Sequence, residues 1–202
     1  GFTAAAISPR SGIFRGTSAV VSLARPADEA SAARPPVYTN IAYHSVAFEQ
    51  GGGYPGSLMG AIALIRQTLI DADWQQSARA AGKSIEPNCL DALASSRGLP
   101  ILFNTDDALD PLRSIKIADE FSRPYLLLGS GREYQRLEAL VSSLDKTRAL
   151  RNSAAAVLLP LNYPRTPDVS TVGRVANVEL ADLMHWEQAP TNPRRLAAAG
   201  EG

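Results

Sequence analysis

The stretch that decides the fold is residues 51–67, GGGYPGSLMGAIALIRQ. A glycine-rich loop, in which Pro55 fixes one φ angle, runs directly into a long apolar segment. Ser57 is placed to be a helix N-cap, because its hydroxyl can accept from the free backbone N–H groups of the first turn. The helix that begins there has only a narrow polar side, formed by Arg66 and its neighbours. A helix this apolar is buried on most sides, so the pattern predicts a loop that enters a larger fold and forms part of a pocket.

Beyond this helix the sequence alternates between short apolar runs and amphipathic stretches. Strands are predicted at residues 99–103, 125–128 and 155–159, and helices at residues 89–96, 109–121, 132–144, 178–186 and 193–199. Asn192 is placed as the N-cap of the last helix. Strand and helix units of this length form parallel sheets with right-handed crossovers. The predicted fold class is therefore α/β with a parallel sheet, either doubly wound or part of a (β/α)8 barrel.

The first fifty residues predict strands and loops. Strands are expected at residues 2–7, 18–23 and 40–48, the last one partly exposed. Residues 25–36 are rich in Ala, Ser, Pro and charge, which predicts a surface loop. We expect the strand at 2–7 to lie in the same parallel sheet as the later strands. Residues 1–202 are interpreted as a single domain.

Composition excludes several classes of protein. The chain carries 20 basic and 20 acidic residues, so no net charge draws it to nucleic acid or to an acidic membrane surface. No apolar run reaches the roughly 18–20 residues that a membrane-spanning helix needs. Cys89 is the only cysteine, so no intrachain disulfide can form. One thiol does not identify the redox compartment, and the localisation stays open.

Both ends of the sequence are unusual for a complete protein. Residues 2–7 form an apolar strand with no turn or cap before it, and the sequence stops just after a helix end at Gly200. Complete domains usually cover an apolar strand edge at a terminus. We therefore expect a fragment of a longer protein, which needs the rest of its parent chain or further copies of itself.

Four stretches resemble the amidohydrolase superfamily, in its imidazolonepropionase-related branch, and they occur in the expected order. They are residues 1–5 with 11–16 (GFTAA and SGIFRG), residues 51–67, residues 109–121 with the strand after them, and residues 186–200 (WEQAPTNP to LAAAG). The resemblance implies a TIM-like (β/α)8 barrel. Since a full barrel takes roughly 250 residues, this chain would be an incomplete segment of one. It also implies an activity, the hydrolysis of C–N bonds in a cyclic amide or a related small-molecule substrate.

The family's metal ligands are a His-x-His, a His on each of two middle strands and an Asp, which together hold one or two zinc-like ions. This sequence has only two histidines, His44 and His185, and no His-x-His. Asn104 and Gly129 stand where the middle strands would end in a His. We therefore predict no metal ligand and no cofactor in this chain, and we can name no catalytic residue. The resemblance leaves a divalent ion to the intact protein.

Three functional hypotheses stay open. The chain is part of a metal-dependent hydrolase whose chemistry needs residues outside it, or it is a degenerate relative that binds a ligand or serves structurally. The departures at Asn104 and Gly129 favour the second. A third hypothesis, a separate nucleotide-binding domain, rests only on Gly129-Ser130-Gly131, which is better explained as a tight strand-to-helix turn. The N–H groups of that turn could still hold an anion.

Candidate substrate-binding residues follow from position, because the loops after barrel strands form the functional end. Arg15 follows an early strand, Tyr54 lies in the glycine loop, and Asn104 ends a strand. We expect these three side chains to converge on one concavity. His44, on the approach to the glycine loop, is a further candidate whose alternative is a structural role.

Overall fold

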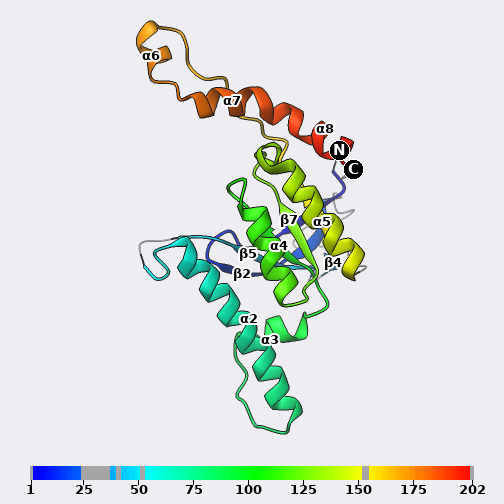
Figure 1. Ribbon diagram of the computed structural model, residues 1–202. Helices are drawn as coiled ribbons and strands as arrows, with labels where there is room; N and C mark the ends of the chain where they lie inside the picture. The colour runs from blue at the N-terminus through cyan, green and yellow to red at the C-terminus, as the bar shows by residue number, and fades with distance from the viewer. Residues whose placement is uncertain (1, 24–36, 40–41, 51–52, 152–154, 201–202) are drawn as a thin grey trace, which may run out of the picture. The chain divides into compact units, whose positions relative to one another are not determined.

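The computed structural model describes residues 2–23, 37–39, 42–50, 53–151 and 155–200 (Figure 1). The surface loop predicted at residues 25–36 and the first two glycines of the 51–56 loop lie outside the described residues. The chain divides into two compact units. The first comprises residues 1–104 and 117–125, and the second comprises residues 105–116 and 126–202.

In the parts of the chain that the structure describes, eight strands form two sheets. A three-stranded antiparallel sheet has the order β1-β3-β4, with the bounds Ala4–Ile7, Ala19–Ser22 and Val37–Thr39. A five-stranded sheet has the order β2-β5-β6-β7-β8, with the bounds Phe14–Thr17, His44–Ala47, Ile101–Asn104, Tyr125–Leu128 and Ala155–Leu158. The fold is therefore mixed α/β, as the sequence predicts.

The five-stranded sheet is mostly parallel. β5 and β6 pair in parallel, with His44 opposite Ile101 and Ala47 opposite Asn104. Bonds from Ile101 N to Pro124 O and from Thr105 N to Leu128 O advance in step, so β7 also runs parallel to β6. Only β2 is shown to be antiparallel, pairing with β5 at the edge of the sheet.

Two strand predictions were wrong. β1 does not join the parallel sheet but pairs antiparallel with β3, with Ala4 opposite Ser22. Strands of parallel sheets are normally covered on both faces, whereas Phe2 and Ile7 are 90% and 56% exposed. β5, predicted to be partly exposed, is buried at all four positions because it lies between β2 and β6.

Nine helical segments accompany the sheets. They are α2 (Leu58–Ala80), α3 (Leu90–Ser95), α4 (Asp110–Glu120), the 3-10 turn η1 (Glu133–Arg136), α5 (Leu137–Arg151), α6 (Val172–Ala176), α7 (Leu180–Gln188), the 3-10 turn η2 (Ala189–Thr191) and α8 (Asn192–Ala198), counted over the described residues. Of these, only η1, α6 and η2 were not predicted as elements of their own. Among the described helices, none combines the length and apolar character needed to cross a bilayer.

The long helix α2 organises the first unit and packs against α3. Ser57 caps it as predicted, since Ser57 Oγ accepts from Gly60 N at 3.2 Å. The prediction of burial on most sides was wrong. The buried positions follow a helical stripe, namely Ala61, Ile65, Leu69, Ala72, Gln75 and Ala78. Met59 and Trp74 on other faces are 82% and 60% exposed.

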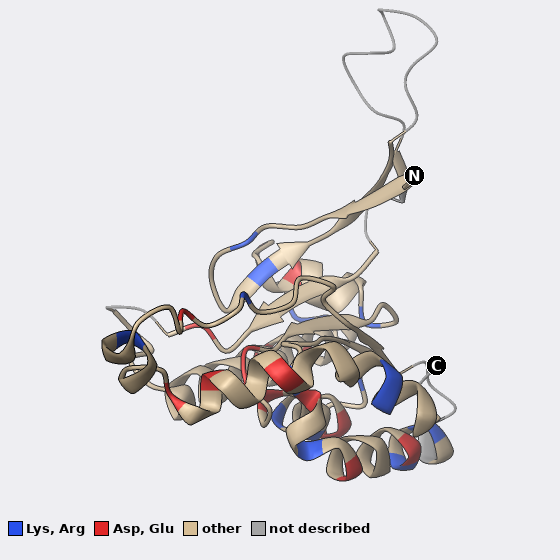
Figure 2. Cartoon of the chain, turned by 90° about the horizontal axis from the view of Figure 1, so that it is seen from above, with Lys and Arg blue, Asp and Glu red and all other residues tan. Residues whose placement is uncertain are grey.

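The core of the first unit lies where the parallel strands β5 and β6 pair. Val46 and Phe103 are completely buried, and the ring of Phe103 stacks on that of Phe48 with centroids 6.4 Å apart. In the second unit, α5 packs against β8 and α8 packs against η1. Acidic and basic side chains are interspersed along the helices, as the balanced composition leads one to expect (Figure 2).

Candidate functional site

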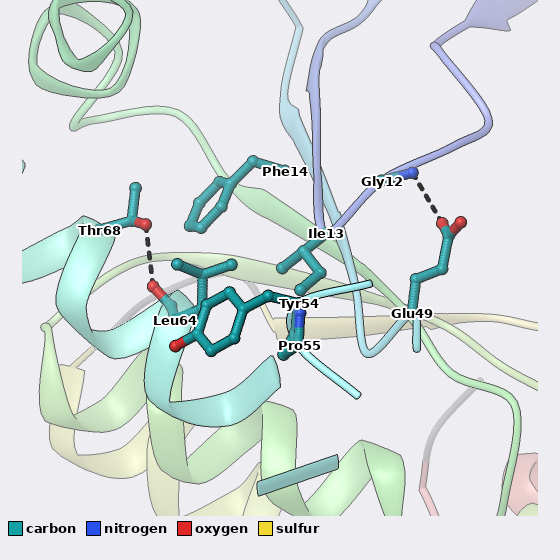
Figure 3. A pocket seen from close by; sticks show the side chains of 8 residues that line it. All are labelled: Gly12, Ile13, Phe14, Glu49, Tyr54, Pro55, Leu64 and Thr68. Carbon is teal, nitrogen blue, oxygen red and sulfur yellow. Dashed lines mark hydrogen bonds between the residues drawn. The ribbon is translucent and has the colours of Figure 1, made fainter. Parts of the chain in front are cut away.

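A cavity of about 380 Å³ opens beside the glycine loop, within the first unit (Figure 3). Its apolar wall is formed by Ile13, Phe14, Pro55 and Leu64, and its polar groups come from Glu49, Tyr54 and Thr68. The volume lies within the usual range of small-molecule sites. The prediction that the glycine loop forms part of a pocket is thus confirmed for its described residues.

Strand pairing places these groups together. Because β2 runs antiparallel to β5, the residues before β2 lie beside the carboxyl end of β5. Ala47 N donates to Ile13 O at 2.9 Å, and Gly12 N donates to Glu49 Oε2 at 2.7 Å (Figure 3). Gly12 adopts a φ of +92°, a conformation that glycine reaches without steric cost. The cavity therefore lies at the carboxyl end of a parallel strand.

The glycine loop sits directly on the first turn of α2. Its Tyr54–Pro55 peptide bond is cis. A Cβ added to Gly60 would lie 2.8 Å from Pro55 Cβ, so a side chain at position 60 would not fit. Gly53 and Gly56 are not constrained in this way. Neither has a positive φ, and an added Cβ would meet nothing within 4 Å at Gly53 and only the Gly53 carbonyl, at 3.6 Å, at Gly56.

Glu49 supplies the charged group of the cavity. Besides the bond from Gly12, its carboxylate lies 3.5 Å from Nη2 of Arg15, whose Nε donates to Gly12 O at 3.3 Å. Thr68 is not free to bind a ligand as a donor, because its hydroxyl donates to Leu64 O at 2.8 Å. Tyr54 is 82% exposed at the entrance. The arrangement suits a small, mainly apolar molecule with an N–H donor directed at a carboxylate.

The structure places both Tyr54 and Arg15 at this cavity, since Tyr54 lines it and Arg15 pairs with Glu49, which also lines it. Asn104 is not among the residues that line it. Its amide donates to Ser45 Oγ at 2.8 Å and to Val46 O at 3.2 Å. Sequence reasoning missed Glu49, although a lone acidic residue directly after an apolar strand was a signal that could have identified it.

His44 lies at the amino end of β5 and does not line this cavity. It is only 5% exposed, its Nε2 lies 3.0 Å from Ala92 O, and the same nitrogen contacts Ser96 Oγ. Burial lowers the pKa of His44, the hydrogen bond with Ala92 acts in the opposite direction, and the charge of Arg123 lowers the pKa further. The ring is therefore neutral near pH 7.

Asn104 and Gly129 stand where the family pattern has a histidine, and neither position is suited to bind a metal ion. At the end of β6, the Asn104 amide is already hydrogen-bonded within the sheet. At the end of β7, a Cβ on Gly129 would lie 2.6 Å from Glu133 Oε1, so a side chain there would displace the Glu133 carboxylate from its hydrogen bonds. Within the described parts of the chain, no three His, Cys, Asp or Glu side chains gather as a metal site would require.

The turn after β7 is closed by a side chain of its own. Ser130 N and Gly131 N donate to Glu133 Oε1 at 2.7 and 3.3 Å, and Asn192 Nδ2 donates to Oε2 at 2.6 Å. The expectation that these backbone groups could hold an external anion was wrong, because Glu133 already occupies them. Asn192 was also predicted to cap α8, but its amide is bonded to Glu133 instead.

Comparison with known proteins shows the fold alone. The sequence matches no protein-family model and none of the curated proteins. The structure is similar to the crystal structure of an amidohydrolase from Thermotoga maritima MSB8, with a TM-score of 0.55 and 15% sequence identity. The match covers 98% of this chain and 55% of that one, so the chain spans about half the length of that amidohydrolase. An amidohydrolase-like fold is therefore supported.

Proposed function

We propose that this chain is part of an amidohydrolase-like protein of the imidazolonepropionase-related branch, and that its first unit binds a small molecule without metal-dependent hydrolysis by the chain's own residues. The strands β5 to β8 would then be a segment of an incomplete (β/α)8 barrel. The main support for this proposal comes from the residues that end β6 and follow β7. Asn104 is hydrogen-bonded within the sheet, and Gly129 is covered by Glu133.

The binding site we propose is the cavity between Tyr54 and Glu49. It lies at the carboxyl end of β5, which is the end where barrel proteins bind their ligands. Its apolar wall would hold the body of the ligand, and the Glu49 carboxylate would accept from an N–H group. A cyclic amide fits this description, because it combines a compact ring with one N–H donor.

Hydrolysis of a cyclic amide C–N bond by the intact protein is the second candidate. The similarity to the Thermotoga maritima amidohydrolase favours it, since the chain corresponds to about half of that protein. In this case a zinc-like ion and its ligands would come from residues beyond this chain, or from a partner copy. The cavity at Glu49 would then position the substrate.

Binding is tested by titrating the purified protein with hydantoin and 2-pyrrolidinone in a calorimeter. We expect saturable binding that weakens about tenfold in Glu49→Gln, because the charged acceptor is lost. Glu86→Gln, an exposed change in the same unit, is the matched control and should bind as the wild type does. Absence of binding, or equal loss in both variants, would contradict the site.

Hydrolysis is tested separately on the protein in its longest available form. Chromatography measures the ring opening of hydantoin with and without added Zn²⁺. No turnover is expected from residues 1–202. Turnover by a longer form that requires Zn²⁺ would support the second candidate, and Zn²⁺-dependent turnover by residues 1–202 alone would overturn the first.

A further inference from the structure

A second cavity, of about 520 Å³, lies in the same unit at the opposite end of β5. His44 begins that strand and pairs with Thr17 at the end of β2, and both residues line this cavity. Another part of the wall comes from Cys89 and from Leu90, Ala92 and Leu93 at α3. It is therefore separate from the Glu49 cavity, which lies beyond the carboxyl end of β5.

The two cavities share a wall. Phe14 and Thr68 line both of them. On this side the wall consists of the apolar Phe14 and of Thr68, whose hydroxyl proton is already donated to Leu64 O. The second cavity is thus apolar on this side as well.

His44 and Thr17 are polar residues of the wall of the second cavity. Ala92 O can only accept, so the Nε2 that lies 3.0 Å from it carries the ring proton. In the neutral ring Nδ1 is then an acceptor. No described residue is hydrogen-bonded to Nδ1, and His44 is one of the residues that line the cavity. The wall of the cavity thus includes a residue with one acceptor that no described residue uses.

Among the residues that the structure describes, no charged side chain lines the second cavity. An ionic ligand would lose its hydration there without gaining a partner of opposite charge. The buried guanidinium of Arg123, which contributes to the lowered pKa of His44, further disfavours a cation. A neutral molecule with an apolar body is the class that fits.

We propose that this cavity is a second binding site, for a small neutral aromatic molecule that carries one N–H or O–H group. The donor bonds to His44 Nδ1, and the apolar body packs against Phe14, Leu90 and Leu93. The proposal is independent of the function proposed above, because none of its polar contacts involves the Glu49 cavity.

Cys89 makes the site measurable. It is exposed, it lines the cavity, and it is the only cysteine of the chain. Its reaction with 5,5′-dithiobis(2-nitrobenzoate) therefore reports on this position without background. A ligand in the cavity should slow that reaction in a saturable way.

Indole and benzofuran are the matched probes, since they have nearly the same shape and only indole has an N–H donor. We expect indole to protect Cys89 at a concentration about tenfold lower than benzofuran does. In His44→Leu the two probes should become equal. Ser96 Oγ still donates to Ala92 O in that variant, so no buried carbonyl is left unpaired. Leu90→Trp, which fills the cavity, should abolish protection by either probe, whereas Glu49→Gln should leave protection unchanged.

The wild-type protein alone also decides the question if a variant fails to fold. Indole should shift the ring resonances of His44 in a nuclear magnetic resonance titration, and benzofuran at the same occupancy should shift them less. Equal potency of the two probes on the wild type, or the absence of both protection and shifts, would overturn the proposal.

Discussion

Glu133 accepts a 2.6 Å hydrogen bond from Nδ2 of Asn192, a residue 59 positions later in the chain. Both side chains are about 1% exposed. Because Glu133 also accepts from Ser130 N and Gly131 N, one carboxylate joins the turn after β7 to the first turn of α8 within the second unit. Asn192 is buried, so the pairing of its amide depends on this single group, whereas Ser130 and Gly131 are part-buried.

Removing the carboxylate should therefore destabilise the protein. Glu133→Ala removes the acceptor of the buried Asn192 amide and of two part-buried backbone N–H groups, and we expect it to lower the free energy of unfolding by about 3 kcal/mol. Asn192→Ala should cost about 1–2 kcal/mol, and the double variant should cost less than the sum, since each change removes the same bond. Urea denaturation measures all three. Glu138→Gln, an exposed change on α5, should stay within about 0.5 kcal/mol of the wild type.

Substitution by alanine should have different effects on stability at two glycines near the first cavity. Replacing a helix-interior glycine by alanine usually stabilises by about 0.5–1 kcal/mol. At Gly60 the added Cβ would meet Pro55 Cβ at 2.8 Å, so Gly60→Ala should instead destabilise by about 1–3 kcal/mol. Gly53→Ala, where an added Cβ meets nothing within 4 Å, should change the unfolding midpoint little. Equal effects of the two substitutions would contradict the close approach of the loop to α2.

From Ser57 onward, most elements were predictable because local signals agree there. The strand at Tyr125–Leu128 was predicted with its observed bounds, and the Ser57 cap follows from the sequence alone. The pairing of β1 was not predictable in the same way. An apolar run such as residues 4–7 specifies a strand, but its partner depends on which other strand reaches it, here β3.

The candidate site shows the same limit. Tyr54 could be predicted to line a pocket because the glycine loop marks a place where the chain must turn near a helix. The role of Glu49 depends on the antiparallel pairing of β2 with β5, which brings Gly12 to its carboxylate. The pairing of Glu133 with Asn192 depends on tertiary structure, and no spacing rule in the sequence indicates it.

The residues at the strand ends also predict the metal content of the purified chain. After dialysis against metal-free buffer, residues 1–202 should retain far less than one zinc ion per chain, because structural zinc sites need about four ligands. The described part of the chain has no cluster of three such side chains. Elemental analysis by mass spectrometry measures this directly. Retention of one ion per chain, lost on mutation of His44 or His185, would show that the prediction is wrong.

The last prediction concerns pH and His44. Its pKa is lowered in the folded state by burial and by the charge of Arg123, whereas in the unfolded chain it titrates near 6.5. Below about pH 6.5 the unfolded chain therefore binds a proton that the folded protein does not. The stability due to the neutral ring is fully present above that pH, and it is lost as the pH falls toward the lower pKa of the folded state. His185, whose pKa is also lowered by burial and by Arg132, acts in the same direction.

Each histidine can be tested separately, because the chain has only these two. In His44→Gln the amide can still donate to Ala92 O, but the side chain no longer titrates. Between pH 7.5 and 5.5 the urea midpoint of the wild type should fall more steeply than that of His44→Gln, with carboxylate protonation common to both proteins. His185→Gln serves as the comparison on the second unit. Parallel midpoint curves for the wild type and His44→Gln would mean that the buried ring does not favour its neutral form.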